Sequence, residues 1–328
     1  MFPEFLVPGL TAFFLTAVVL QLLLVRAHRF LPVDRPNERS LHARPVPRFG
    51  GLAILVGSTL ALTLPGGVAP LWLWPVPVLA GISLLDDFLT LPALPRFIVQ
   101  IVVAGAFALM QSVNLIWLLP VIVAMVWMTN LYNFMDGSDG LAGGMALSGF
   151  GAYALLAAFA GDSELAVVSF VLCGAALAFL LRNLHPASVF MGDAGSIPLG
   201  FLAGAIGLIG VRRGIWDAWL PLLVFLLFIA DATVTLLQRL RRGERIWQPH
   251  RTHYYQRLVR MGLGHAGTAK LYFAAMIGCA ACAVLVQLHA PRLGPALLVA
   301  WALLFTVAGR CIDRRWHTFE KSVAGGLQ

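Results

Sequence analysis

The sequence predicts an all-α polytopic integral membrane protein, with about eleven transmembrane helices in a single domain over residues 1–328. Of its 328 residues, 59% are hydrophobic and only 12% are charged, whereas an average soluble domain carries about 25% charged residues. The mean hydropathy of +0.85 agrees with this composition. The apolar segments are continuous runs of roughly twenty residues, which favours membrane-spanning helices over the shorter alternating strands of a β-barrel.

The predicted spans follow one another through short polar connections. Their approximate ranges are 5–25, 50–65, 70–85, 97–111, 115–131, 141–160, 165–181, 196–211, 217–236, 269–289 and 294–310. The second and third are short and contain Pro and Gly. The first lacks the basic segment of a signal peptide, so we expect a retained span rather than a cleaved leader.

The basic residues are distributed unevenly between the two sides that these spans define. Of 23 Lys and Arg residues, all but Arg212, Arg213 and Arg292 fall in loops on one side. The positive-inside rule assigns that side to the cytoplasm, which puts the N-terminus outside and the C-terminus in the cytoplasm. The net charge of +8 therefore reflects topology and attraction to membrane lipids, and we expect no nucleic-acid partner.

Most carboxylates and histidines of the loops fall on this same cytoplasmic side. Asp86 and Asp87 are adjacent, so they repel each other unless a cation neutralises them. A solvated helix cap is the simpler interpretation for this pair, but the other acids nearby favour a function with Mg²⁺ or as a base.

Asp193 lies in "FMGDAGSIPLGF", where glycines and Ser196 surround it. A carboxylate of this kind suits Mg²⁺, which takes one or two carboxylates together with substrate phosphates. Gly192 allows the backbone to approach a ligand closely at a helix start, which suits a phosphate. A plain Gly–Asp turn between two spans is the alternative.

The stretch "NLYNFMDGSDGLAGG" follows the fifth apolar run directly. Side chains spaced by three cannot all share one narrow stripe of a helix. We therefore expect Asn130 and Asn133 to close the span, and Asp136 and Asp139 to line the turn that the following glycines permit. This turn would form half of a metal–nucleotide site, and Asp193 would complete it.

Cationic and aromatic side chains gather in "WQPHRTHYYQRL". His250, Arg251 and His253 suit contacts with phosphates, although an interfacial amphipathic segment or a zinc pair formed by the two histidines are alternatives. Arg48, which precedes paired glycines, either lines an anionic pocket or belongs to an ordinary basic loop. Asp231 lies inside the ninth span and is expected to face the bundle interior.

This inventory indicates a membrane enzyme that acts on a phosphorylated lipid. Acids suited to Mg²⁺ and cations suited to phosphates match phosphoryl transfer, in which catalysis is mainly positioning and charge neutralisation. A transporter of an anionic or lipid-linked solute is a second hypothesis, but it expects acids near the bilayer midplane, where only Asp231 lies deep. A membrane zinc hydrolase built on His250 and His253 is a third.

Four separated motifs, "DDF", "NLYNFMDGSDGLAGG", "FMGDAGSIPLGF" and "HRTHYYQRL", occur in this order. They resemble the motifs of the polyprenyl-phosphate N-acetylhexosamine-1-phosphate transferases, glycosyltransferase family 4, which are relatives of the phospho-N-acetylmuramoyl-pentapeptide transferases. The loop "RPNERSLHARPVPRFGG" resembles the opening loop of that family. The resemblance covers about residues 30–260 and implies one membrane-embedded transferase domain.

The resemblance implies transfer of an N-acetylated hexosamine 1-phosphate from a UDP-sugar to undecaprenyl phosphate, with release of UMP. It implies Mg²⁺ as the cofactor, with Mn²⁺ as a substitute. It also implies a multi-pass protein of the bacterial inner membrane with a cytoplasmic active site. The product, undecaprenyl-diphospho-sugar, would initiate lipopolysaccharide O-antigen or another cell-surface glycan. We expect membrane lipids as partners, and a homodimer is one expected assembly.

The resemblance also implies a division of roles among the acids. Asp193 matches the Mg²⁺ aspartate of the family, with Asn133 as a second ligand. Asp86 and Asp87 match an aspartate pair that places or deprotonates the lipid phosphate, and Asp136 matches a catalytic acid.

The remaining matches concern the sugar nucleotide. Asp139 matches a residue near the uridine, and His250, Arg251 and His253 match the histidine motif that holds the pyrophosphate, with His253 in the catalytic group. The other substrate-binding candidates are Arg48, Asn130, Gly192 and Ser196.

Two departures bear on the substrate. The pentapeptide enzymes usually carry a lysine soon after the aspartate pair, whereas this loop has only Arg96. Their histidine-rich triplet is "HRTH" here. Both differences favour the branch that uses simple N-acetylated hexosamines, among which N-acetylglucosamine, N-acetylfucosamine and N-acetylquinovosamine remain open.

Overall fold

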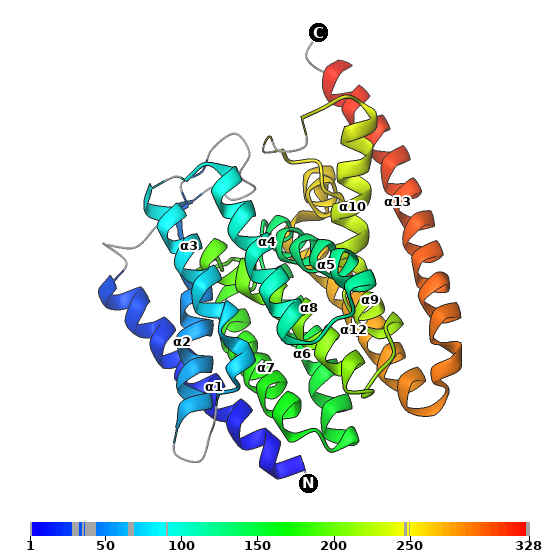
Figure 1. The fold of residues 1–328 in the computed structure, drawn as a ribbon. Helices are drawn as coiled ribbons and strands as arrows, with labels where there is room; N and C mark the ends of the chain where they lie inside the picture. Colours follow the sequence, from blue (N-terminus) through cyan, green and yellow to red (C-terminus); the bar gives the residue numbers. More distant parts are fainter. Residues whose placement is uncertain are drawn as a thin grey trace.

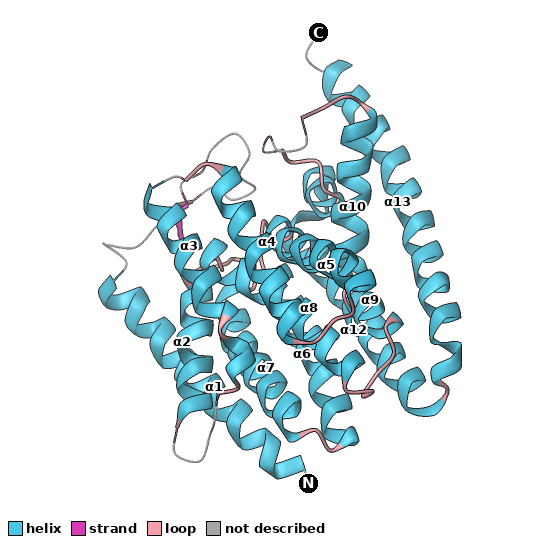
Figure 2. Cartoon of the chain, viewed as in Figure 1, coloured by secondary structure: helices cyan, strands magenta, loops and turns pink. Residues whose placement is uncertain are grey.

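The computed structural model describes residues 2–27, 33–34, 36, 44–64, 69–89, 91–245, 248 and 250–325, and these form a bundle of helices (Figures 1 and 2). The long helices are α1 Phe2–Leu22, α2 Gly50–Thr63, α3 Pro75–Leu89, α4 Ala93–Met110, α5 Leu115–Phe134, α6 Leu141–Ala160, α7 Ser163–Asn183, α8 Asp193–Arg212, α10 Leu226–Arg241, α12 Gly264–His289 and α13 Gly294–Gly325. The all-α prediction is therefore confirmed.

Several short elements complete the described chain. They are α9 Trp219–Val224, α11 Tyr254–Leu258, the π-helical turns Leu23–Ala27 and Val259–Leu263, and the 3-10 turns Leu71–Leu73 and Pro291–Leu293. The strands β1 Val33–Asp34 and β2 Val46–Pro47 pair antiparallel, with Val33 opposite Pro47 and Asp34 opposite Val46. This small ribbon lies at the same end of the bundle as the start of α2 (Figure 1).

The described residues contain nine helices long and apolar enough to cross a membrane, fewer than the eleven predicted. The predicted span at 50–65 forms α2, whose 14 residues reach only about 21 Å of a roughly 30 Å hydrocarbon core. The predicted span at 217–236 is broken at Phe225 into α9 and α10. The other nine predicted ranges each overlap one of the nine membrane-length helices.

The centre of the bundle is formed by α6, α7 and α8 (Figure 1). In α6 and α8, 78% and 83% of the residues in the most apolar window are buried, whereas in α13 none is. The central helices are rich in Gly and Ala, which allows close helix packing within a membrane. The apolar side chains of α13 are therefore left for lipid contact along the rim.

Polar contacts distinguish the two ends of the bundle. At one end, Arg213 binds Asp162 at 2.9 Å, which links the turn after α8 to the start of α7. At the other end, Arg48 binds Asp193 at 3.0 Å, which links the segment before α2 to the start of α8. The clustered acids and histidines therefore share one end, as the alternation of spans predicts; the assignment of that end to the cytoplasm remains a prediction.

Candidate active site

The turn between α5 and α6, residues 135–140, lies at the centre of the candidate site. Helix α5 continues to Phe134, so Asn130 and Asn133 lie in its last turns, and Asp136 and Asp139 follow in the 135–140 turn, as expected. Gly140 has φ = +81° at the start of α6, a conformation that favours glycine. Successive side chains of this turn contact different parts of the bundle.

The segment before α2 is held beside the start of α8 by backbone hydrogen bonds. Gly50 and Gly51 donate from their N–H groups to the carbonyl oxygens of residues 190–191, at 2.9 and 2.8 Å. A Cβ atom on Gly51 would lie 2.2 Å from the Cα of Gly195, so only glycine permits this approach. These contacts bring the guanidinium of Arg48 to the carboxylate of Asp193.

Arg48 is surrounded by carboxylates. Burial acts to lower its pKa, but the carboxylates outweigh this effect and the pKa is raised. The acids responsible are Asp193, Asp34, Asp87 and Asp136. In this structure the guanidinium binds protein acids, and the role of Arg48 in lining an anionic pocket stays a prediction.

Asp136 joins the 135–140 turn to the start of α8. Its Oδ2 accepts a 3.0 Å hydrogen bond from the N–H of Gly192, which has φ = +74°. Burial raises the pKa of Asp136 to about 8, since it outweighs the opposing effects of Arg48 and of the Gly192 hydrogen bond, while Asp193 adds to it. Without a further cation, this carboxyl group therefore holds a proton at neutral pH.

Asp86 and Asp87 lie in the last turn of α3, where neighbouring side chains point about 100° apart. Asp86 pairs with Arg96 and accepts a 2.8 Å hydrogen bond from the N–H of Leu91. Asp87 is repelled by Asp193 and attracted by Arg48. Its Oδ2 atom is buried and has no hydrogen-bond partner among the described residues. Asp86 is thus engaged in a structural contact, whereas Asp87 belongs with Asp136 and Asp193 to the acid cluster around Arg48.

The amides of α5 have different surroundings. Asn133 accepts a 2.7 Å hydrogen bond at its Oδ1 from the hydroxyl of Ser196, which connects α5 with α8 beside the acids. The side-chain amide of Asn130 instead donates to the Oε1 of Gln100 at 2.6 Å and to the carbonyl oxygen of Val126 at 2.7 Å. Its contacts lie within the helix bundle, and its place among the substrate-binding residues stays a prediction.

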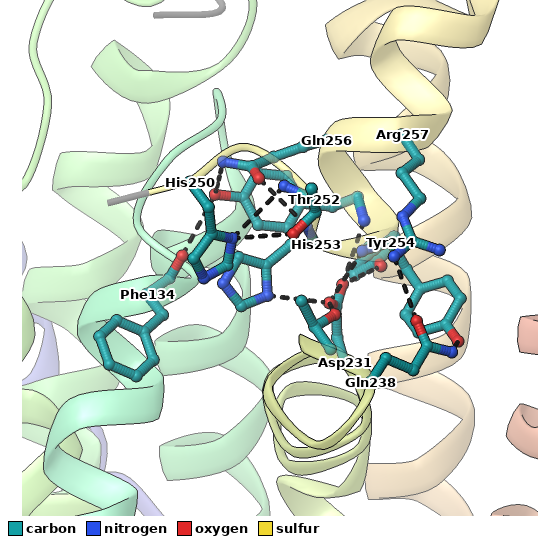
Figure 3. A network of polar contacts seen from close by, with 12 residues as sticks. Phe134, Asp231, Gln238, His250, Thr252, His253, Tyr254, Gln256 and Arg257 are labelled. Atoms are coloured by element: carbon teal, nitrogen blue, oxygen red, sulfur yellow. Dashed lines mark hydrogen bonds and ion pairs between the residues drawn. The ribbon is translucent and has the colours of Figure 1, made fainter. Parts of the chain in front are cut away.

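The histidine segment, residues 250–257, packs against the end of α5 at Phe134 (Figure 3). Tyr255 donates from its hydroxyl to the carbonyl oxygen of Phe134 at 3.1 Å. A Cβ on Gly137 would lie 2.1 Å from that hydroxyl oxygen, so the turn needs glycine there. His253 is buried, and its ring stacks on that of Phe134 with centroids 6.2 Å apart. The ring of His250 lies tilted beside it, with centroids 4.8 Å apart.

His250 is a neutral group in this environment. Burial is the largest effect that lowers its pKa, to about 3, and the neighbouring His253 and Arg239 add to it. Its Nδ1 lies 3.0 Å from the hydroxyl of Thr252. His250 therefore offers a neutral hydrogen-bonding group at pH 7, while the neighbouring Arg251 is exposed and carries the positive charge.

Asp139 forms a further group of polar contacts with His185 and His265, two residues that the sequence analysis did not select. His185 Nδ1 lies 2.7 Å from Asp139 Oδ2, and His265 Nδ1 lies 3.8 Å from Oδ1. The two imidazole rings are parallel with centroids 5.4 Å apart, and His265 also contacts the hydroxyl of Ser138 at 3.0 Å. His185 lies a few residues before the "FMGDAG" motif, and this proximity could have marked it as a site residue. His265 lies at the start of a distant helix, and no motif in the sequence marks it.

Two sets of side chains are candidates for holding a cation. Asp87, Asp193 and Asn133 offer hard oxygen ligands of the kind Mg²⁺ prefers. The buried Oδ2 of Asp87, which has no hydrogen-bond partner among the described residues, is available as one of them. Among the described residues, the one cluster of at least three His, Cys, Asp or Glu donors is Asp139, His185 and His265, with ligand atoms within 4.8 Å of one another. That cluster does not include the predicted zinc pair.

Comparison with known proteins adds a family and a set of relatives. Residues 70–211 match the model described as "Glycosyl transferase family 4". A Bacillus subtilis (strain 168) protein named "Probable undecaprenyl-phosphate N-acetylglucosaminyl 1-phosphate transferase" is 30% identical over 80% of this chain and 78% of its own. A Mycobacterium leprae (strain TN) "Decaprenyl-phosphate N-acetylglucosaminephosphotransferase" is 31% identical over 82% and 80%. A Yersinia pestis "Undecaprenyl-phosphate alpha-N-acetylglucosaminyl 1-phosphate transferase" is 28% identical over 87% and 85%.

Proposed function

Because the chain belongs to glycosyl transferase family 4, we propose that it transfers an N-acetylated hexosamine 1-phosphate from a UDP-sugar to undecaprenyl phosphate. A phosphate oxygen of the lipid attacks the phosphorus that carries the sugar. The bond between that phosphorus and the UMP oxygen breaks, so the products are undecaprenyl-diphospho-sugar and UMP. Relatives whose printed names describe the same transfer of N-acetylglucosamine 1-phosphate support this proposal.

The observation that carries the proposal is the convergence of acids from three separate segments around one arginine. Asp87, Asp136 and Asp193 all act on Arg48 electrostatically, although they come from α3, the 135–140 turn and α8. Carboxylates that share one site repel one another unless cations or protons offset their charge. A site that holds both cations and anions at a membrane surface suits the transfer of a phosphoryl group.

Asp193 and Asn133 would hold Mg²⁺, with Mn²⁺ as a substitute, and Asp87 would supply a further oxygen ligand. The ion would neutralise charge on the phosphate oxygens. Arg48 and Arg96 already lie 3.0 and 3.6 Å from the two oxygens of Asp193. Their guanidinium groups would bind phosphate oxygens as substrate arrives, because arginine recognises phosphate and carboxylate with the same fork of donors.

The remaining residues would orient the two substrates. His250, Arg251 and His253 would contact the pyrophosphate, with a neutral imidazole at His250 and a positive charge at Arg251. Asp86 and Asp87 would position or deprotonate the lipid phosphate at the end of α3, where an acceptor could approach from the bilayer.

The nucleotide would lie toward the α7–α8 loop. Asp139, His185 and His265 form a hydrogen-bonding group with parallel rings, which is suited to a uridine. Gly192 and Ser196 would support the phosphates at the start of α8, although the N–H of Gly192 is already donated to Asp136.

The setting of the reaction follows from the topology. We place the active site on the cytoplasmic face of a bacterial inner membrane, because the basic loops lie at the same end as the acids. The product would initiate lipopolysaccharide O-antigen or another cell-surface glycan, and a homodimer is the proposed assembly. The sugar is an N-acetylated hexosamine, and N-acetylglucosamine competes with N-acetylfucosamine and N-acetylquinovosamine.

The competing hypotheses receive less support. Transport of an anionic or lipid-linked solute would favour acids near the bilayer midplane that can bind the solute. Asp231, the acid that lies deepest, instead accepts hydrogen bonds from the histidine segment with both of its oxygens. Hydrolysis with zinc on His250 and His253 would favour a third ligand beside them, whereas the one cluster of three donors in the described chain lies around Asp139.

The test is a donor screen with the purified protein, undecaprenyl phosphate and Mg²⁺. We expect UMP release and a lipid-linked product with at least one UDP-N-acetylhexosamine. Absence of UMP with all of them, from folded protein, would contradict the proposed reaction. Comparing the three candidate sugars also identifies the preferred donor.

A further inference from the structure

Asp231 lies apart from the acid cluster, inside α10, and is only 3% exposed. The prediction that it faces the bundle interior is confirmed. Both of its carboxylate oxygens are fully engaged by the histidine segment and its surroundings (Figure 3). A carboxylate buried in a helix bundle needs such partners, and here one of them is a residue of the candidate active site.

Three contacts fall on Oδ1 of Asp231 and two on Oδ2. Oδ1 accepts from the N–H of Tyr254 at 2.9 Å and lies 3.2 Å from Nδ1 of His253, while the hydroxyl of Thr235 lies 3.3 Å away. Oδ2 accepts from the N–H of Tyr255 at 3.1 Å and from the hydroxyl of Tyr272 at 2.6 Å. Asp231 therefore holds the start of α11 and the ring of His253 with the same carboxylate.

This contact determines which nitrogen of His253 carries a proton. A carboxylate only accepts hydrogen bonds, so the 3.2 Å contact requires a proton on Nδ1 of His253. The ring is held in place by the side chains of Phe134 and Tyr255, which stack on it at 6.2 and 5.7 Å. Nε2 is then the only nitrogen left for a ligand.

We propose that Asp231 is a positioning residue that fixes His253 as the Nδ1–H tautomer and reserves Nε2 for the substrate. Nε2 accepts a hydrogen bond when the ring is neutral and donates one to a phosphate oxygen when the ring carries both protons. The substrate in this statement rests on the proposed function, whereas the tautomer does not. In the Ser-His-Asp triad, replacing the equivalent aspartate with asparagine gives the wrong tautomer and costs about 10⁴ in kcat.

The first experiment measures the tautomer directly. The measurement is ¹⁵N NMR of the detergent-solubilised full chain with labelled histidine. The chain contains eight histidines, and the signals of His253 are assigned as the pair that disappears in His253→Gln. We expect a His253 signal with the proton on Nδ1 and an unprotonated Nε2 in the neutral ring. A proton on Nε2 and none on Nδ1 would overturn the proposal, whatever the enzymatic activity.

The second experiment uses matched variants. Asp231→Asn can donate a hydrogen bond to Nδ1, so we expect mixed His253 tautomers and a fall in the rate of UMP release by about 100-fold or more. Tyr272→Phe removes one hydrogen bond to Asp231 without touching His253. It should lower the melting temperature but leave the tautomer intact and the rate within about twofold.

The outcomes separate the two proposals. If His253 carries its proton on Nδ1 but no UDP-sugar gives UMP, the positioning by Asp231 stands and the proposed reaction fails. If UMP is released and Asp231→Asn retains both the tautomer and the rate, Asp231 is only a structural anchor of α11. Should Asp231→Asn fail to fold, the tautomer of the wild-type protein still decides the question.

Discussion

Asp136 accepts a 3.0 Å hydrogen bond from the backbone N–H of Gly192, a residue 56 positions later in the chain. This bond joins the turn after α5 to the start of α8 and sets Asp136 beside Asp193. The 135–140 turn makes comparable contacts at each step, since Ser138 contacts His265 and Asp139 contacts His185. A short turn thereby connects the acid cluster, the histidine segment and the proposed nucleotide group.

The first prediction concerns Gly192, whose backbone has φ = +74° and whose missing Cβ would lie 2.7 Å from the carbonyl oxygen of Arg48. Gly192→Ala should lower the free energy of unfolding by about 1–3 kcal/mol and abolish most UMP release, because the Asp136 bond and the Arg48 contact cannot both survive. Thermal unfolding and the transfer assay measure the two effects.

Gly161→Ala is the matched control for this glycine. Gly161 also has positive φ, +77°, but a Cβ there meets no heavy atom within 4 Å, and it lies at the opposite end of α6. Gly161→Ala should lower the free energy of unfolding through the same backbone strain, and it should leave UMP release unchanged. Equal losses of UMP release in the two variants would contradict the account of Gly192.

The second prediction concerns the pH dependence of stability. An unfolded Asp136 releases its proton near its ordinary pKa of about 4, whereas the folded one holds it up to about 8. Between these values the folded state binds more protons, so raising the pH should lower the free energy of unfolding. Melting temperatures in EDTA from about pH 5 to about pH 8 measure this. An unchanged slope in Asp136→Asn would show that another group is responsible.

The third prediction separates the two acids of α3 by metal binding. Asp87→Asn should weaken Mn²⁺ or Mg²⁺ binding by about tenfold or more, because its buried Oδ2 is free to act as a ligand. Asp86→Asn should leave the affinity within about twofold, since Arg96 and Leu91 already engage its carboxylate. Titration of Mn²⁺ by electron paramagnetic resonance gives both affinities. The reverse order of effects would reassign the ligand.

The fourth prediction concerns the nucleotide group. His185→Ala and His265→Ala should each raise the KM for the UDP-sugar several-fold, with little change in the KM for undecaprenyl phosphate, because both histidines contact Asp139. His289→Ala, at the far end of α12, is the control and should change neither constant. A fall in bound zinc without any change in KM would instead indicate a metal site formed by Asp139, His185 and His265.

Much of the fold follows from hydropathy, and its irregularities do not. The continuous apolar runs predict the long helices well, and Asn130 and Asn133 correctly mark the end of α5. The break at Phe225 was not predicted, since neither Pro nor Gly stands at that position and the apolar run continues through it. The predicted span at 50–65 runs two residues past the end of α2, because the sequence stays apolar after Thr63.

The sequence predicts which residues gather at the candidate site but not which of them contact each other. Asp87, Asp136 and Asp193 could be assigned to one group because alternating spans bring their loops to one end. Pairwise contacts could not be deduced, since they depend on how loops pack. The pairing of Asp139 with His185 and His265, and that of Asp231 with His253, join segments far apart in the chain. A buried acid such as Asp231 predicts that a partner exists but not its identity.

The most direct test of the central claim is the effect of Asp193→Ala on UMP release from the preferred UDP-N-acetylhexosamine in the presence of Mg²⁺ and undecaprenyl phosphate. Asp193 links Arg48, Arg96 and the proposed ion. We predict a loss of about 10³-fold or more in kcat for a variant that remains folded, together with loss of metal binding. Retention of metal-dependent UMP release within about tenfold of the wild-type rate would contradict the claim that this acid cluster is the active site.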